Sequence, residues 1–342
     1  MAGKPSGGKA PDVSIVIPTL NAEKTLPRCL ESITHQDFGG AIEIIVADGG
    51  STDGTVSVAR EYGCIIVENH LKTGEAGKAC GIRKATGEIV ALIDSDNLLC
   101  GDDWLKRMTA PFRDSGIAGS EPLEYEFRRS DAPLTRYCAL MGMNDPLCYF
   151  IGNYDRVNTI TGRWTGLDIA TRDRGDYLDV YLETGALPTM GANGFLVRRN
   201  LLEEMKIGDY LFDIDLLYNL VKANHHRFAK VKIGIVHIYG RGLGTFARKQ
   251  LRRARDYQYY RARGMRSYPW SRQKRWALAK FTVYCLLVVP LLAQSLIGYR
   301  KKPDSAWALH APACVITLFI YSWGFIEGAI RPREQKRTGW SQ

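Results

Sequence analysis

Residues 13–93 alternate short apolar runs with segments of helical spacing, and this pattern constrains the fold more than any other feature of the chain. Near-continuous apolar runs that alternate with segments of 10–14 residues are typical of strands buried on both faces of a parallel sheet, with helices as the connections. We therefore predict an α/β fold. The four strand-like runs are 13–17, 42–47, 64–67 and 88–93.

The middle of the chain is less regular. Residues 122–184 are polar and aromatic, and we interpret them as an insertion or a substrate-shaping region. Patterns of strand and helix return at 191–197, 213–223 and 230–236, so we expect the α/β domain to continue to residue 240.

Acidic residues follow several of the predicted strands. Ligands bind at the carboxyl ends of strands in open α/β sheets, so these residues are candidates for a site. Two carboxylates separated by one residue are stabilised together by a hard divalent cation such as Mg²⁺ or Mn²⁺, which usually bridges to substrate phosphates. A solvated turn is the alternative for Asp94 and Asp96, and an ordinary carboxylate at a helix N-terminus is the alternative for Asp213 and Asp215. The clusters are Asp48, Asp94-Ser95-Asp96 and Asp213-Ile214-Asp215.

The charge is divided unevenly along the chain. The net charge is +10, but residues 1–240 carry 26 basic and 32 acidic side chains, whereas residues 241–276 carry 12 basic and one acidic. Because the basic residues lie next to apolar segments, they indicate an anionic membrane surface as the partner and not nucleic acid. We divide the chain into a flexible leader (1–11), a catalytic domain (12–240), a basic amphipathic membrane-interface segment (241–276) and a C-terminal part (277–342) that consists of a transmembrane hairpin and a basic tail.

Two apolar segments in that last part, Phe281–Gly298 and Ser305–Ile330, are long enough to cross a bilayer core of about 30 Å. We predict two transmembrane helices after a basic amphipathic helix that begins near Leu243. The basic loop Arg300–Lys302 opposes the positive-inside rule, so a re-entrant hairpin remains open. Buried core helices are a further alternative.

Eight cysteines are scattered without a CxxC pair, and the leader lacks an apolar signal-peptide core. This scattered spacing indicates free thiols in a reducing compartment and argues against a zinc site. We therefore expect a catalytic domain on the cytoplasmic side of the cell membrane.

Three stretches, VSIVIPTLNAEKTLPRCLESI, IEIIVADGGSTDGT and GKACGIRKATGEIVALIDSDN, resemble the family 2 glycosyltransferases. The resemblance is strong over residues 12–110 and looser over 185–245. It implies the GT-A fold, a mixed nucleotide-binding sheet with flanking helices, and transfer of a sugar from a nucleoside-diphosphate sugar with Mg²⁺ or Mn²⁺.

The resemblance also implies roles for individual residues. The metal ligands would be Asp94, Asp96 and His237. Asp53 belongs to the second motif, and its alternative role is to cap a helix. Arg83 would lie near the diphosphate, and its alternative role is that of a surface helix residue. The donor site would comprise Pro18, Thr19, Asn21, Glu23, Asp48, Gly49, Lys78, Arg83, Asp94 and Ser95.

On the acceptor side, GANGFLVRR at 191–199 resembles the family's acceptor loop. Inverting members place a carboxylate after it that deprotonates the acceptor, normally within a Glu-Asp pair. This chain has Phe212-Asp213 there, so the base is either Asp213 or Asp215, and the sequence favours Asp215 slightly because it opens the helix.

The segment Gln273–Trp276 is one residue short of the Gln-x-x-Arg-Trp motif of processive relatives. Together with the few apolar segments, this favours an enzyme that adds one sugar to a lipid-linked acceptor, a glycolipid or a polyprenyl phosphate. Two alternatives are a membrane-tethered nucleotide-binding module without activity and a nucleotidyltransferase. The second usually has a Gly-rich loop after the first strand, which PTLNAEKT lacks.

Overall fold

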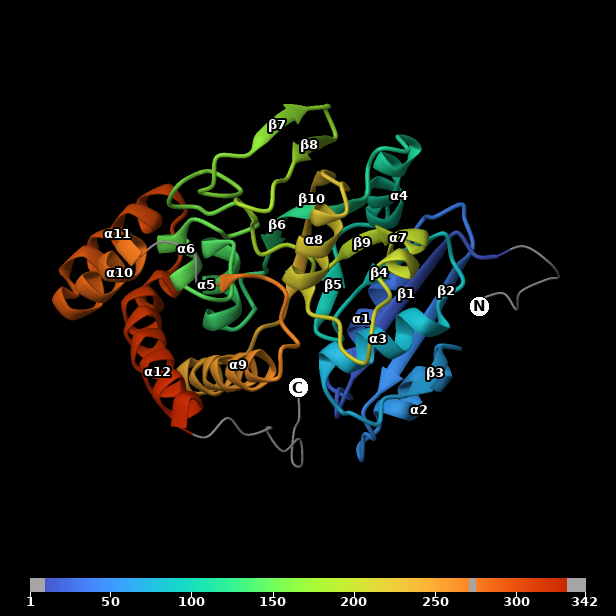
Figure 1. Ribbon diagram of the computed structural model, residues 1–342, viewed down its shortest axis with the longest axis horizontal. Coiled ribbons are helices and arrows are strands. Elements are labelled where there is room, and N and C mark those ends of the chain that lie inside the picture. The colour runs from blue at the N-terminus through green and yellow to red at the C-terminus, as the bar shows by residue number, and fades with distance from the viewer. Residues whose placement is uncertain (1–9, 271–274, 331–342) are drawn as a thin grey trace.

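A ten-stranded mixed sheet forms the centre of the computed structural model, which describes residues 10–270 and 275–330, without the side chains of 328–330 (Figure 1). The strand order is β3-β2-β1-β4-β9-β6-β10-β8-β7, with β5 paired to β10. β1 is parallel to β2 and β4, whereas β9 runs antiparallel to β4 and β6. The strands are β1 (Val13–Thr19), β2 (Ile42–Asp48), β3 (Ile65–Glu68), β4 (Ile89–Leu92), β5 (Asn97–Leu99), β6 (Gly119–Glu126), β7 (Ala170–Asp173), β8 (Tyr177–Tyr181), β9 (Phe195–Arg198) and β10 (Arg227–His237).

Helices cover both faces of this sheet. The odd-numbered residues of β1 pack against α1 (Leu26–Thr34), α2 (Thr55–Glu61) and α4 (Trp104–Thr109). Val16 on the opposite face packs among residues of α3 (Gly74–Lys84), α7 (Arg199–Glu204) and α8 (Asp213–Lys222). The predicted mixed α/β sheet with flanking helices is confirmed.

The prediction for residues 122–184 needs correction, because a central strand runs into this stretch. β6 lies between β9 and β10 and is buried along most of its length. Its sequence, GSEPLEYE, contains a proline and three glutamates, which conceal it from a search for apolar runs. The stretch also contains α5 (Pro133–Met141), α6 (Leu147–Ile151), β7 and β8.

The C-terminal helices form a separate layer at one end of the molecule, opposite β3 and α2 (Figure 1). They are α9 (Leu243–Ala262), α10 (Arg275–Leu287), α11 (Val289–Lys301) and α12 (His310–Ile330), and the 3-10 helix η3 (Ser305–Leu309) precedes α12. Another 3-10 helix, η1 (Ala110–Arg113), lies outside this layer and follows α4. Trp307 of η3 is buried among residues of α5, including Leu134 and Tyr137.

The prediction of two transmembrane helices is not confirmed. The first apolar segment is broken at Val288, and α10 and α11 meet at 94°. Within the described residues, Ser305–Glu327 is the one continuous helical segment long and apolar enough to cross a membrane, and the bent pair would be a second if it formed one span.

Two further expectations can be compared with the structure. All eight cysteines are free, as predicted. Residues 1–9 of the proposed leader and Gln273 and Lys274 of the shortened motif lie outside the described residues.

Candidate functional site

The register of β5 and β10 brings Asp96 and His237 together. Asn97 pairs with His237 across these antiparallel strands, and the Ile238 amide donates to the Asp96 carbonyl at 2.9 Å. The residue before Asn97 therefore lies beside the end of β10, where His237 Nε2 is 3.5 Å from Asp96 Oδ1. Two of the three predicted metal ligands are thus neighbours.

Asp94, the third, lies near Lys78 and Asp213. Lys78 Nζ is 2.8 Å from Asp213 Oδ1 and 3.7 Å from Asp94 Oδ1, so one ammonium group joins two carboxylates from distant parts of the chain. The glycines of α3 explain how Lys78 reaches this position. A Cβ at Gly77 would lie 2.7 Å from the Pro18 side chain, and one at Gly81 would lie 2.3 Å from the Val16 side chain, so only glycines let α3 approach β1 this closely.

The charges of the site alter the proton affinities of its carboxyl groups. Burial acts to raise the pKa of Asp96, but the neighbouring His237 and Lys249 outweigh it and lower the pKa to about 2. Burial raises the pKa of Asp213 to about 6, with Lys78 acting in the opposite direction. The two carboxyl groups are therefore suited to different tasks: Asp96 stays ionised, and Asp213 can exchange a proton near neutral pH.

Asn97 and Asn193 connect the acidic turn with the loop 189–193. The Asp94 amide donates to Asn97 Oδ1 at 3.0 Å, and Asn97 Nδ2 donates to Asn193 Oδ1 at 3.0 Å. Asn193 Nδ2 then donates to the Tyr125 hydroxyl at 3.0 Å. Asn193 has a φ of 51°, a conformation that asparagine tolerates better than most residues. The two loops thus share one network of hydrogen bonds.

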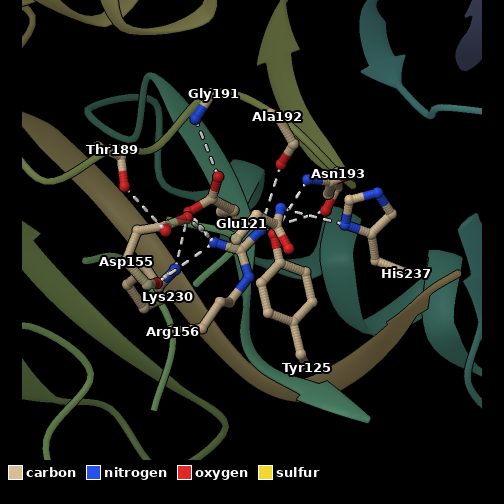
Figure 2. A network of polar contacts seen from close by, with 11 residues as sticks. Glu121, Tyr125, Asp155, Arg156, Thr189, Gly191, Ala192, Asn193, Lys230 and His237 are labelled. Atoms are coloured by element: carbon tan, nitrogen blue, oxygen red, sulfur yellow. Dashed lines mark hydrogen bonds and ion pairs between the residues drawn. The ribbon is translucent and has the colours of Figure 1, made fainter. Parts of the chain in front are cut away.

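A cluster of buried charges supports the loop 189–193 from below (Figure 2). Glu121 Oε1 accepts from the Gly191 amide at 2.9 Å, while its Oε2 pairs with Lys230 at 2.7 Å and with Arg156 at 2.6 Å. Arg156 also donates to the Ala192 and Asn193 carbonyl oxygens at 3.2 Å. Because breaking one buried pair would leave an uncompensated charge, the cluster fixes this loop firmly.

The same loop contacts the helix that bears the candidate base. A Cβ at Gly191, whose φ is +114°, would lie 2.7 Å from the Asp213 carbonyl oxygen. The loop backbone therefore packs directly against Asp213, and only glycine fits there. The predicted acceptor loop and the candidate base form one structural unit.

Lys249 of α9 is a site residue that the sequence did not predict. Its Nζ lies 3.9 Å from Asp96 Oδ2 and 4.4 Å from the centre of the Tyr239 ring. Arg253, one turn later, contacts the same ring and donates to the Asn144 carbonyl oxygen at 3.4 Å. The sequence predicts contact with the membrane surface for the basic helix as a whole. It does not reveal that one face of this helix contacts the acidic turn.

Asp48 and Thr19 lie together at the ends of β2 and β1. Asp48 accepts from Thr19 Oγ1 at 3.0 Å, from Ser51 Oγ at 2.5 Å and from the Gly50 and Ser51 amides at 2.9 and 2.8 Å. These bonds fold the loop after β2 back over β1. The Gly49 amide donates to the Thr19 carbonyl at 2.8 Å, and a Cβ at this position would lie only 3.3 Å from the same oxygen, a close approach that glycine eases.

Asn21 and Glu23 hold the adjacent loop. Asn21 Oδ1 accepts from the Thr52 amide at 2.9 Å, and Glu23 Oε2 accepts from the Gly54 amide at 2.6 Å. Asp53 accepts from the Thr55 amide at 3.0 Å just before α2, but the N-cap of this helix is Gly54 and no side chain caps it, so the alternative interpretation of Asp53 as the cap is wrong. Pro18 and Ser95 are buried.

The structure does not bring Arg83 and Asp215 into the acidic cluster. Arg83 is exposed and donates to the Gly208 carbonyl at 2.9 Å. Asp215 is buried, forms an ion pair with Arg266 and accepts from the Ser267 and Tyr268 amides at 3.1 and 2.5 Å. This geometry favours Asp213 over Asp215 as the base, opposite to the slight preference drawn from the sequence.

A divalent cation fits the donor set at this site. Mg²⁺ and Mn²⁺ bind oxygen ligands, commonly one or two carboxylates completed by substrate phosphates. Asp96 and His237 face each other, and Asp94 belongs to the same turn. No group of three acidic, histidine or cysteine side chains in the described residues could hold a metal ion by itself, so phosphate oxygens would have to complete the set.

Comparisons with known proteins identify related sequences and a related fold. Residues 14–178 match the family model for glycosyl transferase family 2. Over 116 residues the chain is 30% identical to glycosyltransferase AglE of Haloferax volcanii, an alignment covering 31% of this chain and 37% of that protein. Over 107 residues it is 36% identical to a PGL/p-HBAD biosynthesis glycosyltransferase of Mycobacterium tuberculosis, covering 30% and 41%. The chain thus spans less than half the length of these curated relatives.

A solved structure shares the fold over most of the chain. A mannosyltransferase of Pyrobaculum calidifontis, determined in complex with GDP-Man and Mn²⁺, superposes with a TM-score of 0.53 at 18% identity. The superposition covers 92% of this chain and 88% of that protein. The expected GT-A fold is thereby confirmed.

Proposed function

The chain belongs to glycosyl transferase family 2 through residues 14–178, and from this premise we propose that it transfers a sugar from a nucleoside-diphosphate sugar to a lipid-linked acceptor at a membrane surface. The observation that carries the proposal is the convergence of Asp94, Asp96, His237, Lys78 and Asp213 at the carboxyl ends of the central strands. Donors bind at this edge in open α/β sheets.

The donor would lie between the turn 94–96 and the loop after β1. Asp96 and His237, with Asp94, would hold a divalent cation, which neutralises the negative charge of a departing nucleoside diphosphate. Lys78 and Lys249 add two positive charges beside the same carboxylates. These preorganised charges stabilise the leaving group where its charge develops.

Asp213 would accept the proton of the acceptor hydroxyl. Lys78 contacts its Oδ1, and 31% of the side chain is exposed, so the carboxylate is both oriented and accessible. Its pKa of about 6 leaves it ionised at neutral pH and able to take a proton. Attack by the acceptor from the face opposite the diphosphate would invert the anomeric configuration, and NMR of the product should show the inverted anomer.

The C-terminal helices support a lipid-linked acceptor, either a glycolipid or a polyprenyl phosphate. Exposed apolar side chains gather on α10 to α12, next to a helix with six basic residues. Such a surface binds anionic membranes and would bring the site to acceptors anchored there. We place the protein at the cell membrane, with the catalytic domain on the cytoplasmic side.

Ligand-dependent melting tests the donor site. UDP or GDP with Mn²⁺ should raise Tm, since a ligand at a hundred times its Kd adds about 2.7 kcal/mol to the stability. Asp96→Ala should abolish the shift, whereas Asp102→Ala, an exposed carboxylate in the following loop, should keep it. No shift with any nucleoside diphosphate would reject the proposal. A shift without sugar transfer would instead support a nucleotide-binding module.

A further inference from the structure

Exposed large apolar side chains are concentrated in the C-terminal helices. Within the described residues, all but Leu71, Tyr181 and Met265 lie between residues 276 and 326. Around the bend between α10 and α11, Leu286, Leu287 and Val289 are 71%, 61% and 70% exposed, and Trp276 at the start of α10 is 88% exposed. A surface of this kind at one end of a molecule indicates contact with a membrane or with another protein.

The catalytic domain contacts the middle of α10 and the end of α11. α10 packs against α6, with the Phe281 ring 5.0 Å from the Phe150 ring. At the end of α11, Lys301 Nζ donates to the Ile160 carbonyl at 2.7 Å and Lys302 Nζ lies 4.7 Å from the centre of the Phe127 ring.

The next residues continue along the same domain. Asp304 pairs with Arg136 at 3.3 Å, and Trp307 is buried beside α5. A segment that had crossed a bilayer after α10 could not make these contacts, because the bilayer would separate it from the catalytic domain.

The length and shape of the pair lead to the same conclusion. α10 and α11 have 13 residues each, which corresponds to about 20 Å per helix. Neither is long enough to cross a hydrocarbon core of about 30 Å, and the 94° bend prevents them from acting as one straight span.

α12 is held at its start by the catalytic domain and at its end by α9. His310 Nδ1 is 2.9 Å from the Tyr137 hydroxyl, and Glu327 pairs with Arg255 of α9 at 2.8 Å. If α12 crossed the bilayer, α9 would accompany it with six basic residues, each expensive to place in hydrocarbon. α12 therefore lies along the domain.

We infer that the chain is a monotopic membrane protein: the bend between α10 and α11 inserts into the hydrocarbon of one leaflet, and neither this hairpin nor α12 crosses the bilayer. This inference rests on the membrane association proposed above and specifies its geometry. Basic residues at both outer ends of the hairpin, Arg275 and Arg300, then face the headgroups of the same leaflet. The conflict of the basic loop 300–302 with the positive-inside rule disappears, because the loop never leaves the side of the catalytic domain.

Cysteine accessibility in sealed membrane vesicles tests the inference on the full chain. A membrane-impermeant maleimide is applied to one side, in a background where the partly exposed Cys64, Cys80 and Cys100 are replaced by alanine. Leu71→Cys, an exposed leucine of the catalytic domain, reports the side on which that domain lies.

Arg300→Cys should react from the same side as Leu71→Cys. Leu287→Cys should react from neither side until detergent is added, and Val289→Cys provides a second probe of the bend. Reaction of Arg300→Cys only from the opposite side would show that the hairpin crosses and would overturn the inference.

Free reaction of both bend probes, or their disulfide cross-linking between two chains, would also overturn it, since the bend would then face water or a second copy. Sugar transfer is not part of this readout. A chain that inserts as described but transfers no sugar would reject the proposed function and leave this inference standing.

Discussion

Asp213 and Asp215 are two residues apart on one helix, yet their surroundings differ in kind. Asp215 is enclosed by Arg266 and two backbone amides, whereas Asp213 faces Lys78 and is partly exposed. Sequence spacing places both at the start of α8 and could not separate them, because the partners of Asp215 come from residues 266–268, far along the chain.

Asp213→Asn should therefore lower kcat by about 10²- to 10⁴-fold, the usual contribution of a general base, while UDP or GDP still raises Tm with Mn²⁺. Steady-state kinetics and melting curves measure the two effects. Asp209→Asn, an exposed carboxylate in the preceding loop, is the control and should retain activity. Full activity in Asp213→Asn would remove this residue from the mechanism.

The pH dependence should report the same group. The Asp213 pKa of about 6 lies above the ordinary value, so protonation below pH 6 removes the proton acceptor and kcat/KM should fall about tenfold per pH unit. Because a raised carboxyl pKa means that the folded state binds the proton more tightly than the unfolded state, this titration does not itself destabilise the protein. A pH–rate profile of Asp213→Asn that keeps the same acidic limb would contradict the assignment.

Asp215→Ala should act on stability. Removing a buried carboxylate paired with Arg266 leaves that cation and two amides without their acceptor, at a cost of about 3–5 kcal/mol. Urea unfolding, with Asp209→Ala as the exposed control, measures the difference. A variant as stable as the parent but without activity would instead support Asp215 as the base.

At the scale of elements, the strands that consist of apolar runs could be predicted from the sequence, and so could the carboxylates that follow them. β6 could not be predicted in this way, because Glu121 occupies a fully buried position in it. The charge of Glu121 is compensated by Arg156 and Lys230. Such a strand is recognisable only when the partners of its charges are known. The role of Lys249 was hidden for a similar reason, since the contact with Asp96 joins residues 153 positions apart.

The loop 189–193 and the acidic turn should behave as one element. Asn193→Gly keeps the backbone conformation accessible but removes the hydrogen bonds to Asn97 and Tyr125. We expect kcat/KM to fall about tenfold, the equivalent of 1.4 kcal/mol. Asn224→Gly, another asparagine with positive φ but on the surface, controls for the change in backbone freedom. Equal kinetics in the two variants would show that the network does not position the turn.

For the whole molecule, the sequence showed a mildly acidic domain followed by basic and apolar segments, and it left open how those segments meet a bilayer. The contacts of residues 301–307 and of the start of α12 with the catalytic domain, and of the end of α12 with α9, supply the missing constraint. Hydropathy alone lacks this information, because it records the length of an apolar segment and not what its ends contact. Lys249, which contacts Asp96, and Arg255, which pairs with Glu327 of α12, lie on the same helix, so α9 connects the acidic site with the C-terminal helices.

The proposed function requires that the acidic turn binds a nucleotide sugar and that its nucleoside diphosphate is released. The most direct measurement is nucleoside-diphosphate release by the purified full chain from a panel of nucleotide sugars, with Mn²⁺ and a membrane lipid extract. Release should occur with one donor, should increase with the extract, and should be lost in Asp96→Ala but not in Asp102→Ala. No release from any donor, or equal release by the parent and Asp96→Ala, would contradict the proposed function.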